Sequence, residues 1–357
     1  MKPILLFPCS PLNGLKRVDE DFQQEFDAAT QVGFRTVLFD HDKLVKEGKA
    51  EFNAPLPYRQ ELILRGWMLT LDQYAKLFSA CNDMLITTPE EYEEKHYWPI
   101  AYQKHQILRR NSPHCMWTDS RDFSVKHIKQ EFGGRPILVK DHVKSAKGSP
   151  NAMFIKNSAS KQEVFTVIHN MINERGSLFQ RGIVLKEQVS IQKDAAGNAI
   201  EFRIFYLKGN PISVESNGCE WDYLRAQMLS SSSMSPLIKQ IGESLGNGFY
   251  TVDLMLSDGK WLVIECGDGQ VSGLAAKASP FVFYGKLMGE LMRGKPKEEV
   301  LDDDYKVYPD YFYVADGKVI RSNVSGRVSD LRRDLEERGI SASEITTCDV
   351  FARMEQR

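Results

Sequence analysis

The chain has 357 residues, enough for two or three domain-sized units, because single hydrophobic cores stop growing at roughly 250–300 residues. Its composition is that of a globular protein, with 42% hydrophobic and 26% charged residues. Lysine and arginine number 46 against 48 acidic residues, and the net charge of −2 gives no bulk attraction to nucleic acid or to an anionic membrane. A polyanionic ligand therefore needs a local cluster of positive charge.

The cysteines and the apolar stretches indicate a cytoplasmic protein. The six cysteines are scattered and form no C-x-x-C pair, which is typical of free thiols in a reducing compartment. The opening segment MKPILLFPCSP is too short for a signal peptide and is better interpreted as a first buried strand. No apolar stretch approaches the roughly 20 residues that span a bilayer, so we expect no membrane partner.

The N-terminal third alternates strands and helices. Strands are expected at 3–7, 35–40, 62–64 and 84–87. Between them, Gly33 is expected to end one helix, and Thr70 with Gln73 forms a capping box for another. This β-α-β alternation predicts a small doubly wound α/β domain over residues 1–103.

A second unit, expected over residues 104–183, contains an apolar strand at 136–140 and then a basic loop. The strand ends on Lys140, and Lys144 and Lys147 lie in the loop. If the loop folds back over the strand end, three ammonium groups converge, and phosphates favour such point charges. A solvated basic loop is the alternative. The loop lacks the G-x-x-x-x-G-K-[ST] pattern, which excludes a standard P-loop.

Residues 184–295 change in character to long strands and hairpins. Strands are expected at 182–189, 201–207, 211–215, 249–256 and 261–265. Ser-Pro pairs at 235–236 and 279–280 predict two helix starts, because serine caps a helix and proline suits its first position.

The C-terminal segment, 296–357, is predicted to be an extension. It opens with a charged linker, continues in a hairpin that turns at Asp316 and Gly317, and ends in a charged helix at about 329–338.

Two acidic residues in neighbouring strands are candidate metal ligands. Asp253 lies in an otherwise apolar strand, and Glu265 ends the next one. A two-residue loop at 258–259 would place Asp253 opposite Ile264 and turn the carboxylates to opposite faces. A three-residue loop with a bulge, which the S-D-G-K sequence favours, would pair Asp253 with Glu265. Facing carboxylates repel unless a cation such as Mg²⁺ lies between them; a surface hairpin with incidental acids is the alternative.

Two further charged residues have open interpretations. Asp268, in the glycine-rich loop after Glu265, is either another metal ligand or a turn former. Arg203 lies in an apolar strand on the same face as Glu201, and an arginine there usually binds a carboxylate or a phosphate. An ion pair with Glu201 and a functional role are equally compatible with the pattern.

In their order over residues 104–292, these segments resemble an ATP-grasp enzyme. The resemblance implies an α/β and α+β protein in which the N-terminal doubly wound domain precedes a two-lobed ATP-grasp fold, with ATP between the lobes. It implies that Lys140 contacts phosphate and that the strand at 184–189 binds adenine through Glu187 and the backbone of Gln188 and Val189.

The same resemblance implies magnesium ligands at Asp253 and Glu265. In the typical family pattern an asparagine follows the last metal ligand by two residues, but this chain has Gly267 there, so Asp268 or Gln270 is expected to substitute. The glycine-rich phosphate loop of the family is reduced to Gly148.

A closer resemblance is to the divergent ATP-grasp clade named for an arginine and two lysines, which includes eukaryotic translation-factor assembly proteins of the cell-division-cycle type. It rests on Lys140 with the later Ser145-Ala146-Lys147, and on Val184-Leu185-Lys186 before Glu201-Phe202-Arg203. It implies catalytic roles for Arg203 and Lys147.

The segment Leu64-Arg65-Gly66-Trp67-Met68 resembles one in bacterial members of that clade. It implies a substrate contact for Arg65; a core tryptophan beside a surface arginine is the alternative.

The resemblance implies an ATP-dependent carboxylate–amine ligase that uses ATP and Mg²⁺ and forms an acyl-phosphate. Its carboxylate and amine substrates are expected to be small molecules such as amino acids, or peptides or proteins, and no nucleic-acid partner is expected. An ATP-binding assembly or adaptor protein with little turnover, and a kinase, are the alternatives. The sequence implies no particular oligomeric state.

Overall fold

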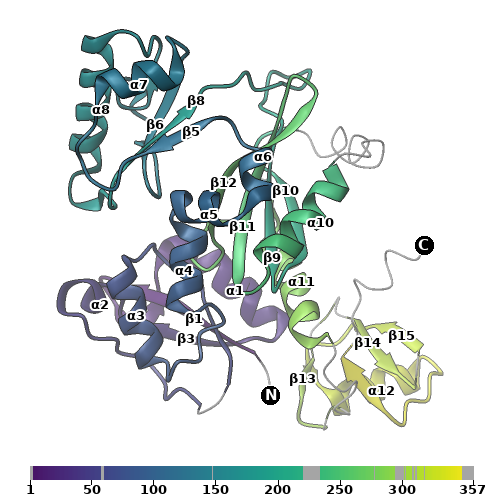
Figure 1. The fold of residues 1–357 in the computed structure, drawn as a ribbon. Coiled ribbons are helices and arrows are strands. Elements are labelled where there is room, and N and C mark those ends of the chain that lie inside the picture. Colours follow the sequence, from purple (N-terminus) through teal and green to yellow (C-terminus); the bar gives the residue numbers. More distant parts are fainter. Residues whose placement is uncertain are drawn as a thin grey trace.

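The computed structural model describes residues 3–57, 60–146, 148–219, 234–276, 278–293, 301, 303–307, 309, 312–316 and 318–347. It has a mixed α/β fold in which an N-terminal domain, two lobes and a C-terminal unit follow one another along the chain (Figure 1). Among the helices of these residues, none combines the length and apolar character needed to cross a bilayer.

The N-terminal domain is built on a sheet in which β1 (Ile4–Ser10) lies between the parallel strands β3 (Arg35–Phe39) and β4 (Leu62–Leu64). The short strand β2 (Gly14–Val18) pairs with the carboxyl end of β1. The fourth strand expected at 84–87 is reduced to a single bridge between Leu62 and Leu85.

Helices cover both faces of this sheet. The short η1 (Glu20–Phe22) leads into α1 (Gln23–Val32), and α2 (His41–Glu47) and α3 (Leu71–Ala80) follow. Gly33 ends α1 in the left-handed conformation, and the capping box of Thr70 and Gln73 begins α3, so both predictions are confirmed.

Three short helices lead from this domain toward the lobes: α4 (Pro89–His96), α5 (Trp98–Lys104) and α6 (Gln106–Arg110). The N-lobe that follows contains β5 (Cys115–Trp117), α7 (Val125–Phe132), β6 (Ile137–Asp141), η2 (Pro150–Ala152), β7 (Phe154–Ile155), α8 (Lys161–Arg175), η3 (Gly176–Leu178) and β8 (Ile183–Glu187). Its antiparallel sheet has the order β5-β8-β6-β7.

The two faces of the N-lobe sheet differ in character. Ile137, Val139 and Leu185 point to the side that α7 and α8 cover and form one apolar core with them. Because side chains alternate along a strand, Lys140 and Lys186 share the opposite face. That face carries the positive charge.

The C-lobe contains β9 (Glu201–Leu207), β10 (Asn210–Ser216), α10 (Met234–Leu245), β11 (Phe249–Ser257), β12 (Lys260–Asp268) and α11 (Pro280–Met292). Its sheet has the order β10-β9-β11-β12 and is antiparallel throughout. Ser279 caps α11 and Pro280 occupies its first turn, as predicted.

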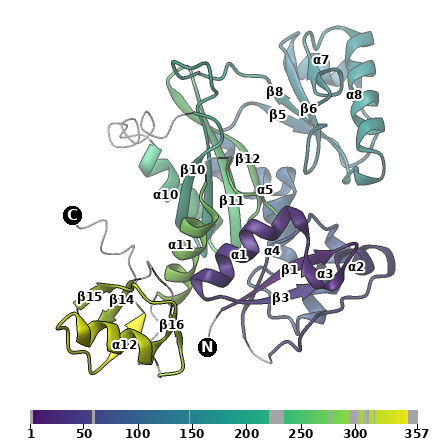
Figure 2. The same ribbon diagram turned by 180° about the vertical axis from the view of Figure 1, so that it is seen from behind.

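The N-terminal domain and the C-lobe share a core. Phe283 and Tyr284 of α11 pack with Phe7 of β1 and with Phe205 of β9 in one apolar cluster. Figure 2 shows α1 and α11 side by side where these two parts meet. The predicted divisions at 103, 183 and 295 stay predictions.

The C-terminal unit has its own small core. It contains β13 (Lys306–Val307), β14 (Phe312–Ala315), β15 (Lys318–Arg321), β16 (Gly326–Arg327), α12 (Val328–Glu337) and β17 (Ile345–Thr347). The hairpin of β14 and β15 and the charged helix were both predicted, although Gly317 lies outside the described residues.

Candidate functional site

Asp253 of β11 lies directly opposite Glu265 of β12, as predicted. The predicted three-residue loop is wrong: Asp258 and Gly259 form a two-residue turn, with φ of 48° and 75°, that pairs Ser257 with Lys260. The register shifts instead between Asp253 and Leu254, where one extra residue of β12 forms a bulge. The bulge, and not the turn, brings the two carboxylates to one face.

Arg203 of β9 lies directly opposite Asp253 on the other side of β11. Its Nε donates to Asp253 Oδ1 at 2.8 Å and its Nη2 to Oδ2 at 2.7 Å, a bidentate pair. Its Nη1 donates to the carbonyl of Gly273 at 2.9 Å. The bonds to Asp253 outweigh burial and raise the pKa of Arg203. Glu201, the other partner considered, instead accepts from Asn217 at 2.9 Å.

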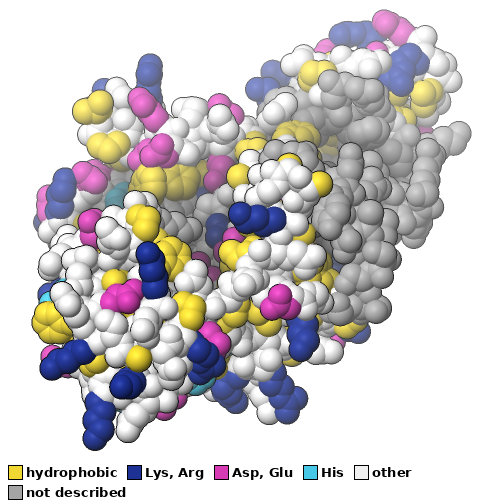
Figure 3. Space-filling view, turned by 90° about the horizontal axis from the view of Figure 1, so that it is seen from above, with side chains coloured by type: hydrophobic (Ala, Val, Ile, Leu, Met, Phe, Trp, Pro, Cys, Tyr) yellow, Lys and Arg dark blue, Asp and Glu magenta, His cyan; other side chains and the backbone are white. Residues whose placement is uncertain are grey.

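Lys140 reaches across from the N-lobe to the same carboxylate pair. Its Nζ donates to Glu265 Oε1 at 2.5 Å, and Lys140 is 4% exposed. The pair joins β6 to β12 and therefore joins the two lobes. Figure 3, seen from above, shows a hollow in the surface with acidic and basic side chains on its walls.

Lys186 of β8 is a third cation at this place, and it was not among the predicted site residues. Its Nζ donates to the carbonyl of Ile264, the bulged residue of β12, at 2.7 Å and lies 3.2 Å from the ring centroid of Trp98. Burial first, and then the charge of Lys140, lower the pKa of Lys186 to about 7. The sequence does carry a signal for this residue. Lys186 and Lys140 lie at positions of adjacent strands whose side chains share one face of the sheet.

The basic loop is only partly described. Lys144 is exposed, and its backbone amide donates to Asp141 Oδ1 at 2.6 Å, which holds the loop to the end of β6. Lys147 lies outside the described residues.

His96, at the end of α4, is buried among these charges. Burial and then Lys144 and Lys140 lower the pKa of His96 to about 3, while Glu265 acts in the opposite sense. No described residue supplies a hydrogen-bond partner for its Nε2. His96 therefore stays neutral beside the cationic cluster.

Asp268 does not join the other two carboxylates. It lies three positions beyond Glu265 in β12 and so points to the opposite face. It is fully buried, and its Oδ1 accepts from the backbone amide of Gln270 at 3.0 Å. Burial raises the pKa of Asp268 to about 7. Asp268 therefore lies apart from Asp253 and Glu265, and its role as a metal ligand stays a prediction; among the described residues no group of three or more His, Cys, Asp or Glu side chains is placed to hold a metal.

Arg65 is buried and Trp67 is exposed, which is the reverse of a core tryptophan beside a surface arginine. It is 1% exposed, whereas Trp67 is 41% exposed. Arg65 forms an ion pair with Glu25 at 2.8 Å and donates to the carbonyls of Gly269 and Ser272. It lies at the junction of the N-terminal domain with the C-lobe.

The expected adenine-binding residues lie where the chain leaves the N-lobe. The side chain of Glu187 accepts from Arg135 at 2.7 Å, and its backbone amide donates to His114 at 2.8 Å. The amide of Gln188 donates to Pro136 at 2.9 Å. These two backbone amides are therefore hydrogen-bonded within the N-lobe. A role of Val189 and of the backbone carbonyls of residues 187–189 in binding a base stays a prediction.

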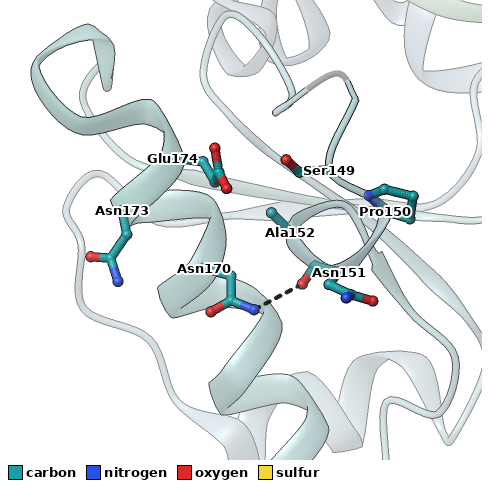
Figure 4. A pocket seen from close by; sticks show the side chains of 7 residues that line it. All are labelled: Ser149, Pro150, Asn151, Ala152, Asn170, Asn173 and Glu174. Carbon is teal, nitrogen blue, oxygen red and sulfur yellow. Dashed lines mark hydrogen bonds between the residues drawn. The ribbon is translucent and has the colours of Figure 1, made fainter.

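A separate cavity of about 590 Å³ lies between α8 and η2. Figure 4 shows Glu174 of α8 and Ser149 on its two sides, with Asn170 donating to the carbonyl of Asn151 at 3.2 Å. The cavity lies beside α8, which covers the face of the N-lobe sheet opposite to Lys140. It is not part of the charged site.

Residues 131–287 match the family model described as "ATP-grasp domain, R2K clade family 3". No curated protein matches the chain. Among solved structures, a RimK domain ATP-grasp protein from Sphaerobacter thermophilus is 12% identical, with a TM-score of 0.50 over 80% of this chain and 98% of that one. This similarity concerns the fold alone.

Two other solved structures are less similar. D-alanyl-alanine synthetase A from Vibrio cholerae is 11% identical over 81% of this chain and 93% of that one, with a TM-score of 0.47. Cdc123 from Schizosaccharomyces pombe is 13% identical over 52% and 87%, with a TM-score of 0.40. The family match agrees with the motif order and with the paired lobes, and residues 131–287 of this chain are therefore an ATP-grasp domain of the R2K clade.

Proposed function

We propose that this chain is an ATP-dependent carboxylate–amine ligase that works through an acyl-phosphate. The observation that carries the proposal is one cluster of charges between the lobes: Lys140 with Glu265, Arg203 with Asp253, and Lys186 beside them. Its three cations match a triphosphate, and its two facing carboxylates match a divalent metal.

The two carboxylates fit magnesium. Asp253 and Glu265 are directly opposed across β11 and β12, and each is neutralised by a cation. Magnesium in nucleotide sites usually takes one or two carboxylates and completes its shell with water and phosphate oxygens, so these two suffice. When bound, the metal supplies charge neutralisation at the phosphoryl group. We assign the metal to Asp253 and Glu265, without Asp268.

The cations proposed to bind the phosphates lie on both lobes. Lys140 and Lys186 approach from the N-lobe, and Arg203 approaches from the C-lobe. We propose that they bind phosphate oxygens, that Lys144 and Lys147 cover the phosphates from the loop after β6, and that the 187–189 segment holds adenine.

Phosphoryl transfer needs positioning and charge neutralisation more than a protein nucleophile. Arg203 and Lys147 are the proposed catalytic residues, because a rigid fork and a loop cation stabilise charge that develops on the transferred group. The products are ADP, phosphate and an amide between the carboxylate and amine substrates.

The test is ADP release by the purified full-length chain with magnesium-ATP and paired pools of carboxylates and amines, both amino acids and peptides. Hydroxylamine is added to a parallel reaction, because it traps an acyl-phosphate as a hydroxamate. A ligase forms ADP only when a carboxylate is present and gives a hydroxamate with hydroxylamine. ADP with a stable phosphorylated product and no hydroxamate indicates a kinase. Tight ATP binding without turnover in any pool contradicts the proposal and favours an assembly or adaptor protein.

A further inference from the structure

Arg65 belongs to the N-terminal domain, but its contacts lead to the proposed nucleotide site. The residue directly follows β4, and its guanidinium is enclosed between the rings of Phe205 and Phe283, with Cζ 5.7 Å from each centroid. Two aromatic side chains of the C-lobe therefore flank it.

Every nitrogen of the guanidinium is engaged within the protein. Nε donates to Glu25 Oε2 at 3.0 Å, and Nη2 donates to both oxygens of Glu25 at 2.8 and 3.2 Å. Nη1 donates to the carbonyls of Gly269 and Ser272, the latter at 2.9 Å. The hydroxyl of Tyr284 also interacts with Arg65, so all three nitrogens of the guanidinium have partners within the protein. A substrate contact at Arg65 therefore competes with these internal partners.

The two carbonyls that Arg65 binds lie in the 269–273 segment, which follows β12. The same segment ends at Gly273, whose carbonyl accepts from Nη1 of Arg203 at 2.9 Å. Arg65 thus binds the first and fourth residues of the segment, and the fifth residue binds Arg203, which also binds Asp253.

Glu25 of α1 fixes the orientation of the Arg65 guanidinium. Its Oε2 also accepts from the hydroxyl of Tyr284 at 2.6 Å, so the carboxylate is fixed from the C-lobe side as well. A bidentate arginine–carboxylate pair is rigid because two parallel bonds fix the plane of both groups. The plane of the guanidinium then sets where the carbonyls of Gly269 and Ser272 lie.

We propose that Arg65, clamped by Glu25, is a positioning residue that holds the 269–273 segment in place and through it orients Arg203 for the triphosphate. This inference rests on the proposed function for the role of Arg203. It replaces the substrate contact expected for Arg65.

The test compares three variants of the full-length chain. Arg65→Lys keeps the charge but loses the planar fork. Glu25→Gln keeps the shape but puts an N–H group against the donors of Arg65. Asp27→Asn is the matched control, since it makes the same carboxylate-to-amide change on α1 at an exposed residue whose carboxylate accepts from Gln23.

Two measurements are made on each variant. The first is the affinity for magnesium-ATP by calorimetry, without any acceptor substrate. The second is the hydrogen-exchange rate of the backbone amides in the 269–273 segment, which does not depend on nucleotide binding. We expect Arg65→Lys and Glu25→Gln to weaken magnesium-ATP binding about tenfold and to speed exchange in the segment, while Asp27→Asn changes neither.

A double-mutant cycle with Arg203→Lys adds a readout that general destabilisation does not move. If Arg65 acts through Arg203, Arg65→Lys costs less than about twofold in affinity once Arg203 is already lysine. Additive losses overturn the inference, as does an Asp27→Asn variant that matches Glu25→Gln in both measurements. Wild-type protein that binds no magnesium-ATP contradicts the proposed function instead, and the exchange rates alone then decide whether Arg65 holds the segment.

Discussion

Lys140 of β6 and Glu265 of β12 form an ion pair of 2.5 Å although 125 residues separate them in the chain. The lysine is more deeply buried than the glutamate, with side chains 5% and 32% exposed. The pair connects the positive face of the N-lobe sheet to the carboxylates of the C-lobe sheet. It therefore places the proposed phosphate and metal ligands within reach of one another.

Lys140→Ala is expected to reduce magnesium-ATP turnover by about 100-fold or more, because a cation aimed at developing phosphate charge is lost. ADP release and an ATP-binding isotherm measure the effect. Lys129→Ala is the control, since Lys129 is an exposed lysine of α7 in the same lobe. Unchanged ATP binding and turnover in Lys140→Ala contradict the assigned site.

Asp253→Asn is expected to weaken both the fold and metal binding. It leaves Arg203 without its carboxylate, and breaking a buried ion pair costs about 3 kcal/mol of unfolding free energy. Urea denaturation measures the loss, and the magnesium dependence of ATP binding measures the second effect. Asp258→Asn in the exposed turn of the same hairpin should change neither, because asparagine tolerates the left-handed conformation there. An Asp253→Asn protein that keeps the wild-type magnesium dependence argues against the metal assignment.

The lowered pKa of Lys186 predicts that the unfolding free energy depends on pH. Its folded-state pKa of about 7 lies below the ordinary 10.5, so the unfolded chain binds more protons between these values and stability rises with pH across that window. Relative to Lys186→Met, the unfolding free energy of the wild type should rise by up to about 1.4 kcal/mol per pH unit above pH 7. Urea denaturation of both proteins at pH 7, 8 and 9 gives the comparison. A pH-independent difference between them contradicts the burial of this lysine.

The raised pKa of Asp268 predicts the opposite pH dependence of stability. The same residue also allows a test of whether it belongs to the metal site. Its folded-state pKa of about 7 lies above the ordinary 3.8, so the folded chain binds more protons and stability falls as pH rises from about 4 to 7. Asp268→Asn should remove this fall while keeping wild-type magnesium-ATP binding. Denaturation curves across that range and ATP calorimetry at several magnesium concentrations measure both. Loss of the magnesium dependence in Asp268→Asn would restore this residue to the metal site.

Local patterns were sufficient for much of the architecture. Alternation of side chains predicts β6, β9, β11 and β12, and the caps at Thr70 and Ser279 begin α3 and α11 as expected. These features depend on residues within four positions of one another, so the sequence carries them directly. A buried acidic residue in an apolar strand likewise points to a partner wherever the strand packs.

Only the tertiary structure decides which partner each charge has. It places the bulge in β12 rather than in the turn, pairs Arg203 with Asp253 rather than Glu201, and turns Asp268 away from Glu265. Residues 50 to 204 positions apart make the contacts of Arg203 with Asp253 and of Arg65 with Gly269. Strand register and the burial of a charge arise from packing between such distant segments, and no pattern of near neighbours encodes them. The sequence by itself therefore determined the strands, the helix starts and the charged residues, whereas the tertiary structure decided which of those charges meet.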